Sequence, residues 1–341
     1  MGCCKKHYVI FGSSSAFATR RLAMKKRGMV RVASIAMAVL VLSMVVPGRA
    51  YSWDPATHAY IEEHLYKKRG QLDDEVLYNR IYGANTIDMF NNKFESPYLE
   101  FAAYLHDTTQ DNFLKVWEKA GTKAEKAFAY GFVGHNNTWG MDSTAHISGI
   151  TSGRGQGYVI AKAQMLAVML KPLLEEQLGQ EVPDEVAVNI CHYFVESGVD
   201  FLVRGMDPSI GNKLIAAAYS RSLEVPALLV NAYQEDFSTL AGSPENAALV
   251  ITIAEGAFQA SMMSYGWALT QDDALDLVAA GMAAVGAEYL GLPQAAVPAL
   301  IPVVKQGIFA AMTLCAPDIE KELRASTGWV NGRLSSNGIS W

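Results

Sequence analysis

The chain has 341 residues, of which 50% are apolar and 18% charged, so it can bury a large core and is far too apolar for a disordered or collagen-like protein. Nine of the 28 Lys and Arg residues lie in the first 52 positions, which hold no acid, and the rest of the chain carries 19 basic against 34 acidic residues. Because that excess of negative charge repels nucleic-acid phosphates, it argues against a nucleic-acid-binding protein.

The first 52 residues are typical of a targeting segment. From Met24 a basic stretch precedes 15 uncharged, largely apolar residues, a layout typical of a secretory signal peptide and short for a membrane span. Small residues allow cleavage after Ala50 or after Ser52, and the second choice makes Trp53 the first residue of the mature chain. We therefore expect translation to start at Met24 and the protein to be exported, to a periplasm or to the cell exterior.

The remaining chain has the pattern of helices throughout. Apolar residues recur at three- and four-residue intervals, and turn-forming residues separate the periodic segments. Alternating β-type patterns joined by tight-turn dipeptides are lacking, so we predict an all-α fold. The clearest predicted helices in the first half are Ala56–Tyr66, Glu75–Tyr82, Ala124–Gly134, Tyr158–Leu178 and Val182–Val203.

The character of the chain changes after residue 204. Region 53–204 is predicted to be the helical core that binds metal, and region 205–341 an apolar helical part packed on it. In the second region, Asn246–Thr270 and Leu277–Ala316 contain few charges, which predicts core helices of a bundle, with a membrane-touching face as the alternative. Two prolines near residue 300 argue against a plain transmembrane helix there.

Histidine is concentrated in the first of these regions. Six histidines follow residue 52, all of them before residue 193, and metal binding is a common reason for such clustering. They are His58, His64, His106, His135, His146 and His192.

The spacing of these histidines from carboxylates sharpens the prediction. His192 and Glu196 are four residues apart, which places both side chains on one helix face at about 6 Å, suited to one metal ion. Asp142 and His146 have the same spacing. His135 precedes Asp142 by seven residues, about 10.5 Å along a continuous helix, and the Asn and Gly residues between them predict a loop that shortens this distance.

Other polar residues have simpler interpretations. Pro55 suits a helix start and puts His58 in the first turn, whereas His64 points about 240° away around the axis and is interpreted as a surface or packing residue. Spacing leaves open whether Cys191 and Cys315 form a disulfide or are two buried thiols. Three carboxylates near the histidines in sequence are interpreted as solvated or capping groups: Asp107, Asp111 and Asp200.

In this order the residues resemble the zinc-dependent phospholipase C family, which is all-helical and related to the S1/P1-type zinc nucleases. The resemblance covers Trp53 to Asp200, and its last element has the His-x3-Glu form of the phospholipases rather than the His-x3-Asp form of the nucleases. The central block reads His-x6-Asp-x3-His, where the family usually reads His-x3-Asp-x5-His. The matching residues are Trp53, His58, Asp88, His106, His135, Asp142, His146, His192 and Glu196.

The resemblance implies a multi-helix bundle like that of phospholipase C and P1 nuclease, with up to three zinc ions. Such a cluster suits phosphodiester hydrolysis, because the metals lower the pKa of a bound water and stabilise charge on phosphate oxygens. Asp88 is the residue expected to act as ligand or general base for that water. The ions would be held by Asp88, His106, His135 and Asp142; by His146, His192 and Glu196; and by His58, Asp142 and the amino and carbonyl groups of Trp53.

We therefore expect a secreted zinc phospholipase C that releases diacylglycerol and a phosphorylated headgroup, with phospholipid or another phosphodiester as substrate and peripheral membrane contact. One alternative is a zinc nuclease or other phosphodiesterase on the same scaffold, which the acidic surface disfavours. The other is a non-catalytic exported protein with structural zinc. A site with no open coordination position would favour the latter.

Overall fold

A computed structural model describes residues 53–68, 73–91, 93, 95–147, 149–151, 156–178, 181–289 and 293–341. Within these ranges the regular structure is helical, without a strand, which confirms the predicted all-α class. The expected signal peptide, its cleavage sites and the Met24 start lie outside the described residues.

The first half of the described chain contains five long helices and several short ones. Each predicted helix lies within, or close to, one of the long helices: α2 (Pro55–Lys68), α3 (Asp74–Thr86), α6 (Lys123–His135), α8 (Tyr158–Leu178) and α9 (Asp184–Met206). The sequence did not predict the short elements between them, which are the 3-10 helix η1 (Ile87–Phe90), α4 (Tyr98–Leu105), α5 (Leu114–Lys119) and α7 (Met141–His146).

The second half is also helical, and it packs on the first. Its elements are α10 (Ile210–Ser220), α11 (Val225–Ala241), α12 (Pro244–Thr270), α13 (Ala274–Tyr289), η2 (Gln294–Ala296), α14 (Val297–Cys315) and α15 (Ile319–Ser336). The apolar segment Leu277–Ala316 is therefore divided between α13 and α14. Buried apolar side chains from Trp53 to Ile339 belong to one hydrophobic cluster, so both halves share a core.

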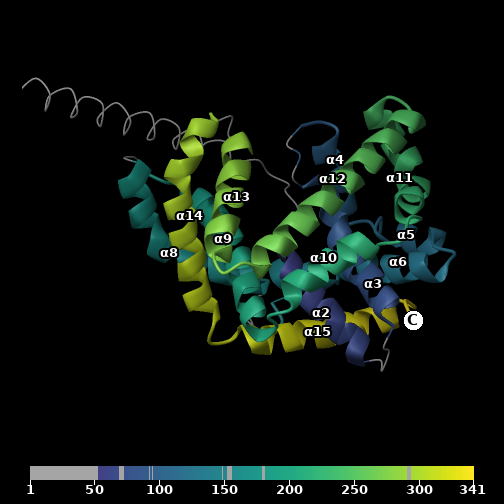
Figure 1. Cartoon of the computed structure of the whole chain (residues 1–341), viewed down its shortest axis with the longest axis horizontal. Helices are drawn as coiled ribbons and strands as arrows, with labels where there is room; N and C mark the ends of the chain where they lie inside the picture. Colours follow the sequence, from purple (N-terminus) through teal and green to yellow (C-terminus); the bar gives the residue numbers. More distant parts are fainter. Residues whose placement is uncertain are drawn as a thin grey trace, which may run out of the picture.

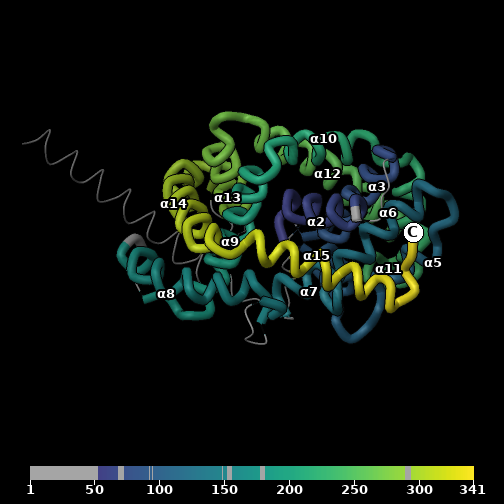
Figure 2. The backbone as a smooth tube through the Cα atoms, turned by 90° about the horizontal axis from the view of Figure 1, so that it is seen from below, coloured from purple at the N-terminus to yellow at the C-terminus, as the bar shows by residue number. Residues whose placement is uncertain are grey.

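The layout places α2 and α9 in the interior of the bundle. Helix α9 packs against α2, α8 and α14, while α10 and α12 pack on each other at the front of the molecule (Figure 1). Helix α15 crosses the lower face, where it contacts α2 and α7 (Figure 2). The N-terminal end of α2 and the middle of α9 therefore lie deep in the fold.

Helices α3 and α6 approach each other at two glycines. A Cβ atom on Gly83 would lie 2.0 Å from the carbonyl oxygen of Phe128, and one on Gly131 would lie 2.0 Å from that of Arg80. The two backbones are thus in direct contact, which only residues without a side chain permit. This contact fixes the end of α6, where His135 lies, relative to η1, which directly follows α3 and carries Asp88.

Candidate metal centre

One group of potential ligands joins α7 to α9. The Nε2 atoms of His146 and His192 lie 3.1 Å apart, and Oε1 of Glu196 lies 3.2 Å from the first and 2.7 Å from the second. His192 and Glu196 come from adjacent turns of α9, as their spacing predicted, and His146 is the last residue of α7. These three side chains are placed to hold one metal ion.

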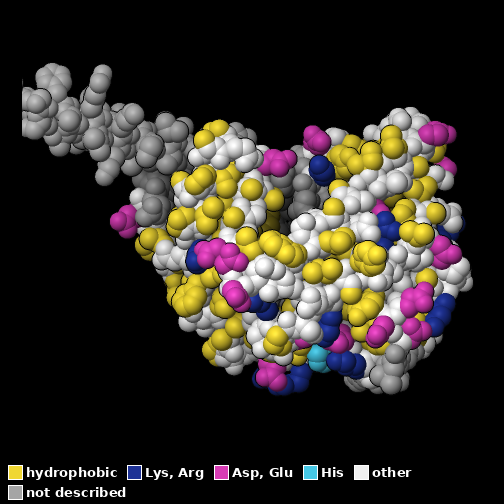
Figure 3. All heavy atoms as spheres, in the orientation of Figure 1, with side chains coloured by type: hydrophobic (Ala, Val, Ile, Leu, Met, Phe, Trp, Pro, Cys, Tyr) yellow, Lys and Arg dark blue, Asp and Glu magenta, His cyan; other side chains and the backbone are white. Residues whose placement is uncertain are grey.

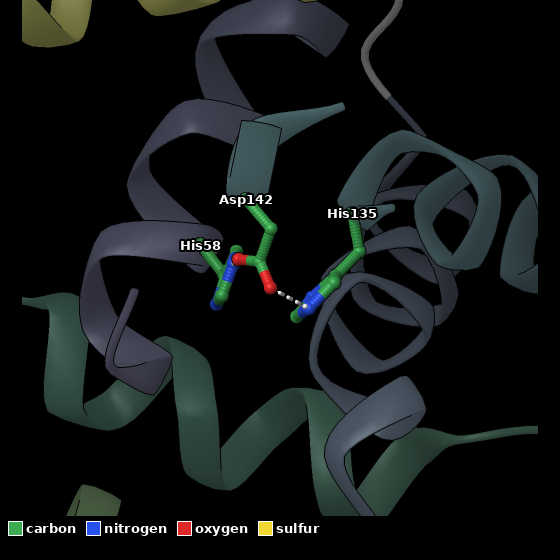
Figure 4. A group of neighbouring side chains, drawn as sticks. All are labelled: His58, His135 and Asp142. Atoms are coloured by element: carbon green, nitrogen blue, oxygen red, sulfur yellow. Dashed lines mark hydrogen bonds and ion pairs between the residues drawn. The ribbon is translucent and has the colours of Figure 1, made fainter. Parts of the chain in front are cut away.

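A second group gathers around Asp142, whose carboxylate points between two histidine rings (Figure 4). Its Oδ1 lies 3.2 Å from Nε2 of His58 on α2, and its Oδ2 lies 2.9 Å from Nε2 of His135 on α6. The two rings stack with their centroids 4.3 Å apart. All three side chains are buried, and they form another set suited to a metal ion.

The third group shares His135 with the second. Oδ1 of Asp88 lies 3.2 Å from Nε2 of His106 and 3.7 Å from Nε2 of His135. Asp88 comes from η1, and His106 is the residue that ends α4, so this group depends on elements that the sequence did not predict. The side chain of Asn91 donates a hydrogen bond of 2.6 Å to Oδ1 of Asp88 and orients that carboxylate.

A tight turn between α6 and α7 brings His135 and Asp142 together. The side-chain oxygen of Asn136 accepts hydrogen bonds from the backbone N–H groups of Trp139, at 2.8 Å, and Gly140, at 3.1 Å. A Cβ atom on Gly140 would lie only 2.5 Å from the carbonyl oxygen of Gly134, so the turn requires glycine there. The loop expected from the sequence is therefore present and replaces the long spacing of a continuous helix.

Trp53 lies against the second group. Its side chain is almost fully buried, its indole N–H donates to the carbonyl oxygen of Met141 at 3.2 Å, and its backbone N–H hydrogen-bonds to Asp142. The main chain of Trp53 thus lies beside the carboxylate that faces both His58 and His135, the position that the family resemblance implied for it.

Asp200 of α9 holds the start of α2 in place. Its carboxylate accepts hydrogen bonds of 2.8 Å from the backbone N–H groups of Ala56 and Thr57, 2.6 Å from the Thr57 hydroxyl and 2.8 Å from the Tyr265 hydroxyl. These N–H groups lack partners within their own helix, so Asp200 acts as a cap supplied by a distant helix. The capping interpretation of Asp200 agrees with this geometry, although the residue is buried rather than solvated.

The hydrogen bonds of two histidines fix which ring nitrogen is available. Nδ1 of His135 lies 2.7 Å from the carbonyl oxygen of Ala84, and Nδ1 of His106 lies 3.1 Å from that of Ala102. A carbonyl only accepts, so each Nδ1 carries the proton and each Nε2 presents a lone pair. Metal-binding histidines commonly use this arrangement.

Several buried atoms of the centre approach one another without hydrogen bonding. Nε2 of His106, Nε2 of His135 and Oδ2 of Asp142 are buried and have no hydrogen-bond partner, although a carboxylate or imidazole atom lies within 3.2 Å of each. Such atoms are costly to bury unless something else satisfies them. Lone pairs that converge on a common point in this way fit a bound cation.

Burial also sets the protonation states that a metal needs. Loss of hydration lowers the pKa of His146 to about 4 and that of His192 to about 3, and it holds the pKa of His58, His106 and His135 below the usual value as well. The imidazoles are therefore neutral at pH 7. Burial raises the pKa of Asp142 well above its ordinary range, and the charge of Glu196 adds to this. A dication would relieve that cost.

Two ligand side chains of the centre are partly exposed to solvent. The side chains of Asp88 and His146 are 19% and 10% exposed, whereas those of the other histidines and of Asp142 are 3% exposed or less. Solvent therefore reaches the centre at Asp88 and at His146.

Sequence reasoning missed one half-buried carboxylate near the ligands, that of Asp54. It accepts a hydrogen bond of 2.6 Å from the Ser197 hydroxyl, and burial, with the nearby charges of Asp200 and Glu196, raises its pKa well above the usual value. The only sequence signal for Asp54 near the ligands was its position next to Trp53. A single Asp before a proline is more often found at the start of a helix, so it was not predicted as a site residue.

The other polar residues considered in the sequence lie outside the three ligand groups. Asp107 caps its own loop by accepting from Thr109 at 2.8 Å, and Asp111 is exposed. The ring of His64 packs on Tyr60 and bonds to its carbonyl oxygen at 2.8 Å, away from all three ligand groups. Cys191 and Cys315 are both buried free thiols, which answers the question that their spacing left open.

The nine residues singled out from the sequence thus converge on one centre, built from α2, η1, α4, α6, α7 and α9. Comparison of the chain with protein-family models, curated proteins and solved structures gave no match. The chemistry of the centre is therefore argued from its own geometry.

Proposed function

We propose that this chain is an exported, zinc-dependent phosphodiester hydrolase of the phospholipase C type. The observation that carries the proposal is the presence of three ligand groups, two of which share His135, while the charge of Glu196 in the third group acts on Asp142. Ions held by such groups would be neighbours, and clustered dications suit a phosphodiester, because they activate a water and stabilise charge on the phosphate oxygens.

The ligand types support zinc. Neutral imidazole nitrogens and carboxylate oxygens are ligands that zinc prefers, and sites rich in oxygen alone would favour Mg²⁺ or Ca²⁺. The group of His146, His192 and Glu196 offers three side chains that belong to no other group, one fewer than the four ligands of a closed structural site. That count favours a catalytic over a purely structural role.

Asp88 is the proposed ligand or general base. Its carboxylate is the most exposed of the ligand side chains, and Asn91 and the rings of His106 and His135 fix its orientation. A partly exposed carboxylate of the centre can accept the proton of a water that attacks a bound phosphate ester. Replacement of Asp88 by Asn should therefore lower kcat far more than it changes substrate binding.

The proposal includes export and a mature N-terminus at Trp53. Signal cleavage after Ser52 would create a free amino group on the residue whose backbone nitrogen already contacts Asp142. N-terminal sequencing of the exported protein tests this directly. A chain that starts at Tyr51 would lack that ligand and contradict this part of the proposal.

Phospholipid is the proposed substrate class. The His-x3-Glu spacing of the last ligand pair has the phospholipase form, and the acidic balance of residues 53–341 disfavours a polyanion. Hydrolysis of nucleic acid with no hydrolysis of phospholipid would replace this proposal by the nuclease alternative.

The deciding experiment combines elemental analysis with hydrolysis assays on the signal-cleaved protein. We expect close to three zinc ions per chain and release of diacylglycerol from phosphatidylcholine. His192→Ala should remove metal and activity together while the far-UV circular dichroism stays helical, and His64→Ala, on α2 but outside the centre, should retain both. Zinc without hydrolysis of any phosphodiester would identify a non-catalytic metal protein, and absence of metal after purification without chelator would overturn the proposal.

A further inference from the structure

Helix α12 presents an uncharged surface to solvent from Leu249 to Trp267. Leu249, Ile253 and Trp267 are each more than half exposed, and the exposed positions between them are Gly, Ala, Ser and Thr. The two carboxylates of the helix lie elsewhere. Glu245 is in the first turn, and Glu255 is buried and paired with Arg221 at 2.6 Å. A solvated helix normally has charges on its outer face, so this surface is unusual.

Helix α14 also exposes mainly uncharged side chains to solvent. Phe309 is 62% exposed, and the other exposed positions of the helix carry Pro, Ala, Gln or Thr. Its single charged residue, Lys305, forms an ion pair with Asp276 of α13. The outer faces of α12 and α14, here called the apolar face, therefore lack an unpaired charge apart from Glu245 at one end.

These helices are apolar enough for a membrane, yet the protein buries little of them. Among the described residues, three helical stretches have the length and composition of a membrane span: Asp184–Met206, Pro244–Thr270 and Gln294–Cys315. Of the apolar window in the first, which is α9, 78% is buried inside the protein, but only 33% and 22% are buried in the windows of α12 and α14. Most of the apolar window of α9 is buried in the core, whereas most of the windows of α12 and α14 is not buried.

Both helices lie on the same side of the molecule. They are at the front in Figure 1, and Figure 3, in the same orientation, shows apolar side chains gathered over α13 and α14 and along α12. Exposed apolar side chains gathered on a folded protein often mark an interaction site.

The inward sides of α12 and α13 contact residues that surround the metal centre. Tyr265 of α12 donates its hydroxyl hydrogen to Asp200, the residue that holds the start of α2. Met282 of α13 contacts the Ser197 hydroxyl, which in turn donates to Asp54. Helix α12 also packs against η1, which carries Asp88. The helices of the apolar face are thus the ones that flank the ligands.

We propose that the apolar face docks on the surface of a zwitterionic phospholipid bilayer and holds the protein at the surface that contains its proposed substrate, an inference that rests on the proposed phospholipase function. Burial of the exposed side chains supplies the binding energy, and Trp267 suits the interface region of a bilayer. The negative balance of residues 53–341 opposes binding to an anionic membrane, so a zwitterionic surface is the one proposed. The buried Arg221–Glu255 pair keeps α12 in the protein core, so the contact is peripheral.

The test is binding to phosphatidylcholine vesicles, measured by flotation, with variants on two faces. Ile253→Asp combined with Phe309→Asp places charge in the apolar face, and we expect at least a tenfold weaker binding. The matched control is Val168→Asp combined with Met169→Asp on α8, which lies across the molecule from α12 in Figure 2 and packs against α14, and where the wild-type side chains are 79% and 60% exposed. The control should bind like wild type, and both variants should retain zinc and hydrolyse a soluble phosphodiester.

Equal binding by the apolar-face variant and wild type would overturn the proposal, as would weaker binding by the α8 variant alone. A wild-type dimer that the apolar-face variant converts to a monomer would show that the face binds a second copy of the chain and would overturn it too. Should the double variant misfold, quenching of Trp267 fluorescence by brominated phosphatidylcholine, with Trp267→Phe as reference, gives the answer on the wild-type fold. Absence of quenching contradicts docking.

A failure of the proposed hydrolase function can be distinguished from a failure of membrane docking. His192→Ala lacks a ligand of the centre but leaves the apolar face intact, so it should bind vesicles like wild type without hydrolysing them. Vesicle binding by wild type without hydrolysis would overturn the proposed activity and leave the docking surface standing.

Discussion

Glu322 is a residue whose negative charge is destabilised by burial in the folded protein. Its carboxyl is buried on α15, accepts one long hydrogen bond of 3.4 Å from Ser326, and has its pKa raised by burial to about 7 from 4.5. A raised carboxyl pKa contributes stability below the unfolded value of 4.5, and this contribution is lost as the pH rises through 7. Ionised Glu322 therefore weakens the fold at alkaline pH.

We predict that Glu322→Gln removes this pH dependence. Wild type should lose up to ~3 kcal/mol of unfolding free energy from this residue between pH 4.5 and pH 8, and the variant should lose none of that part. Glu320→Gln, on the same helix but exposed and paired with Arg324, is the control and should follow wild type. Urea unfolding at several pH values gives the comparison, and equal slopes for Glu322→Gln and wild type would contradict the prediction.

At the scale of a helix, the cap that α9 supplies to α2 has a measurable value. Asp200→Asn keeps the shape of the side chain but turns one acceptor oxygen into a donor that faces the N–H groups of α2 or the hydroxyl of Tyr265. We expect a loss of about 1–3 kcal/mol in unfolding free energy and weaker zinc binding at the group that contains His58, because His58 lies in the first turn of α2.

Tyr265→Phe is the graded comparison for that variant, since it removes one of the four hydrogen bonds to Asp200 and keeps the packing. Its cost should be about 0.5–1.5 kcal/mol, with the zinc content unchanged. Chemical denaturation of both variants measures the loss of unfolding free energy, and elemental analysis measures the zinc content. If Asp200→Asn is as stable as wild type, the cap contributes nothing.

The contact between α3 and α6 provides a second prediction at this scale. Gly131→Ala would drive a methyl group into the backbone of α3 at Arg80, so the two helices must separate. We expect a loss of more than about 3 kcal/mol, since backbone cannot move aside as a side chain can. Gly328→Ala on α15 is the control, because open space surrounds that position, and it should stabilise by up to about 1 kcal/mol. Thermal unfolding of the two variants tests the contrast.

The same elements show how far the sequence could predict the structure. Long amphipathic helices and the pair His192–Glu196 follow from periodicity alone, and both are present. The short α7 does not, because six residues form a helix only when tertiary contacts support them. The contact of His135 with Asp142 depends on the turn at Asn136 and Gly140, and the position of Asp54 depends on packing against Ser197. The spacing of these residues along the sequence determines neither the distance from His135 to Asp142 nor the distance from Asp54 to Ser197.

At the scale of the whole molecule, the centre connects segments that are far apart in the chain. Its ligands come from α2 through α9, so bound zinc would stabilise the native state relative to an unfolded chain that cannot assemble the groups. An ion present at a hundred times its dissociation constant adds about 2.7 kcal/mol.

Chelation should therefore lower the thermal midpoint of the holoprotein. We expect a fall of several degrees on addition of a chelator, restored by zinc but not by magnesium, in a protein of this size. His192→Ala should respond less than wild type because one ligand group is already incomplete. An unchanged midpoint, measured by differential scanning calorimetry, would mean that the fold does not depend on the ions.

The sharing of His135 by two ligand groups has a further consequence for how the centre fills. Nδ1 of His135 is hydrogen-bonded to the carbonyl oxygen of Ala84, so the ring offers a single lone pair, at Nε2, to both groups. An ion that takes this lone pair lowers the affinity of the neighbouring group, and thermodynamic reciprocity makes the effect equal in both directions. The two positions would therefore fill over a wider range of free zinc than independent sites, and partly loaded protein would persist when the metal supply is limited.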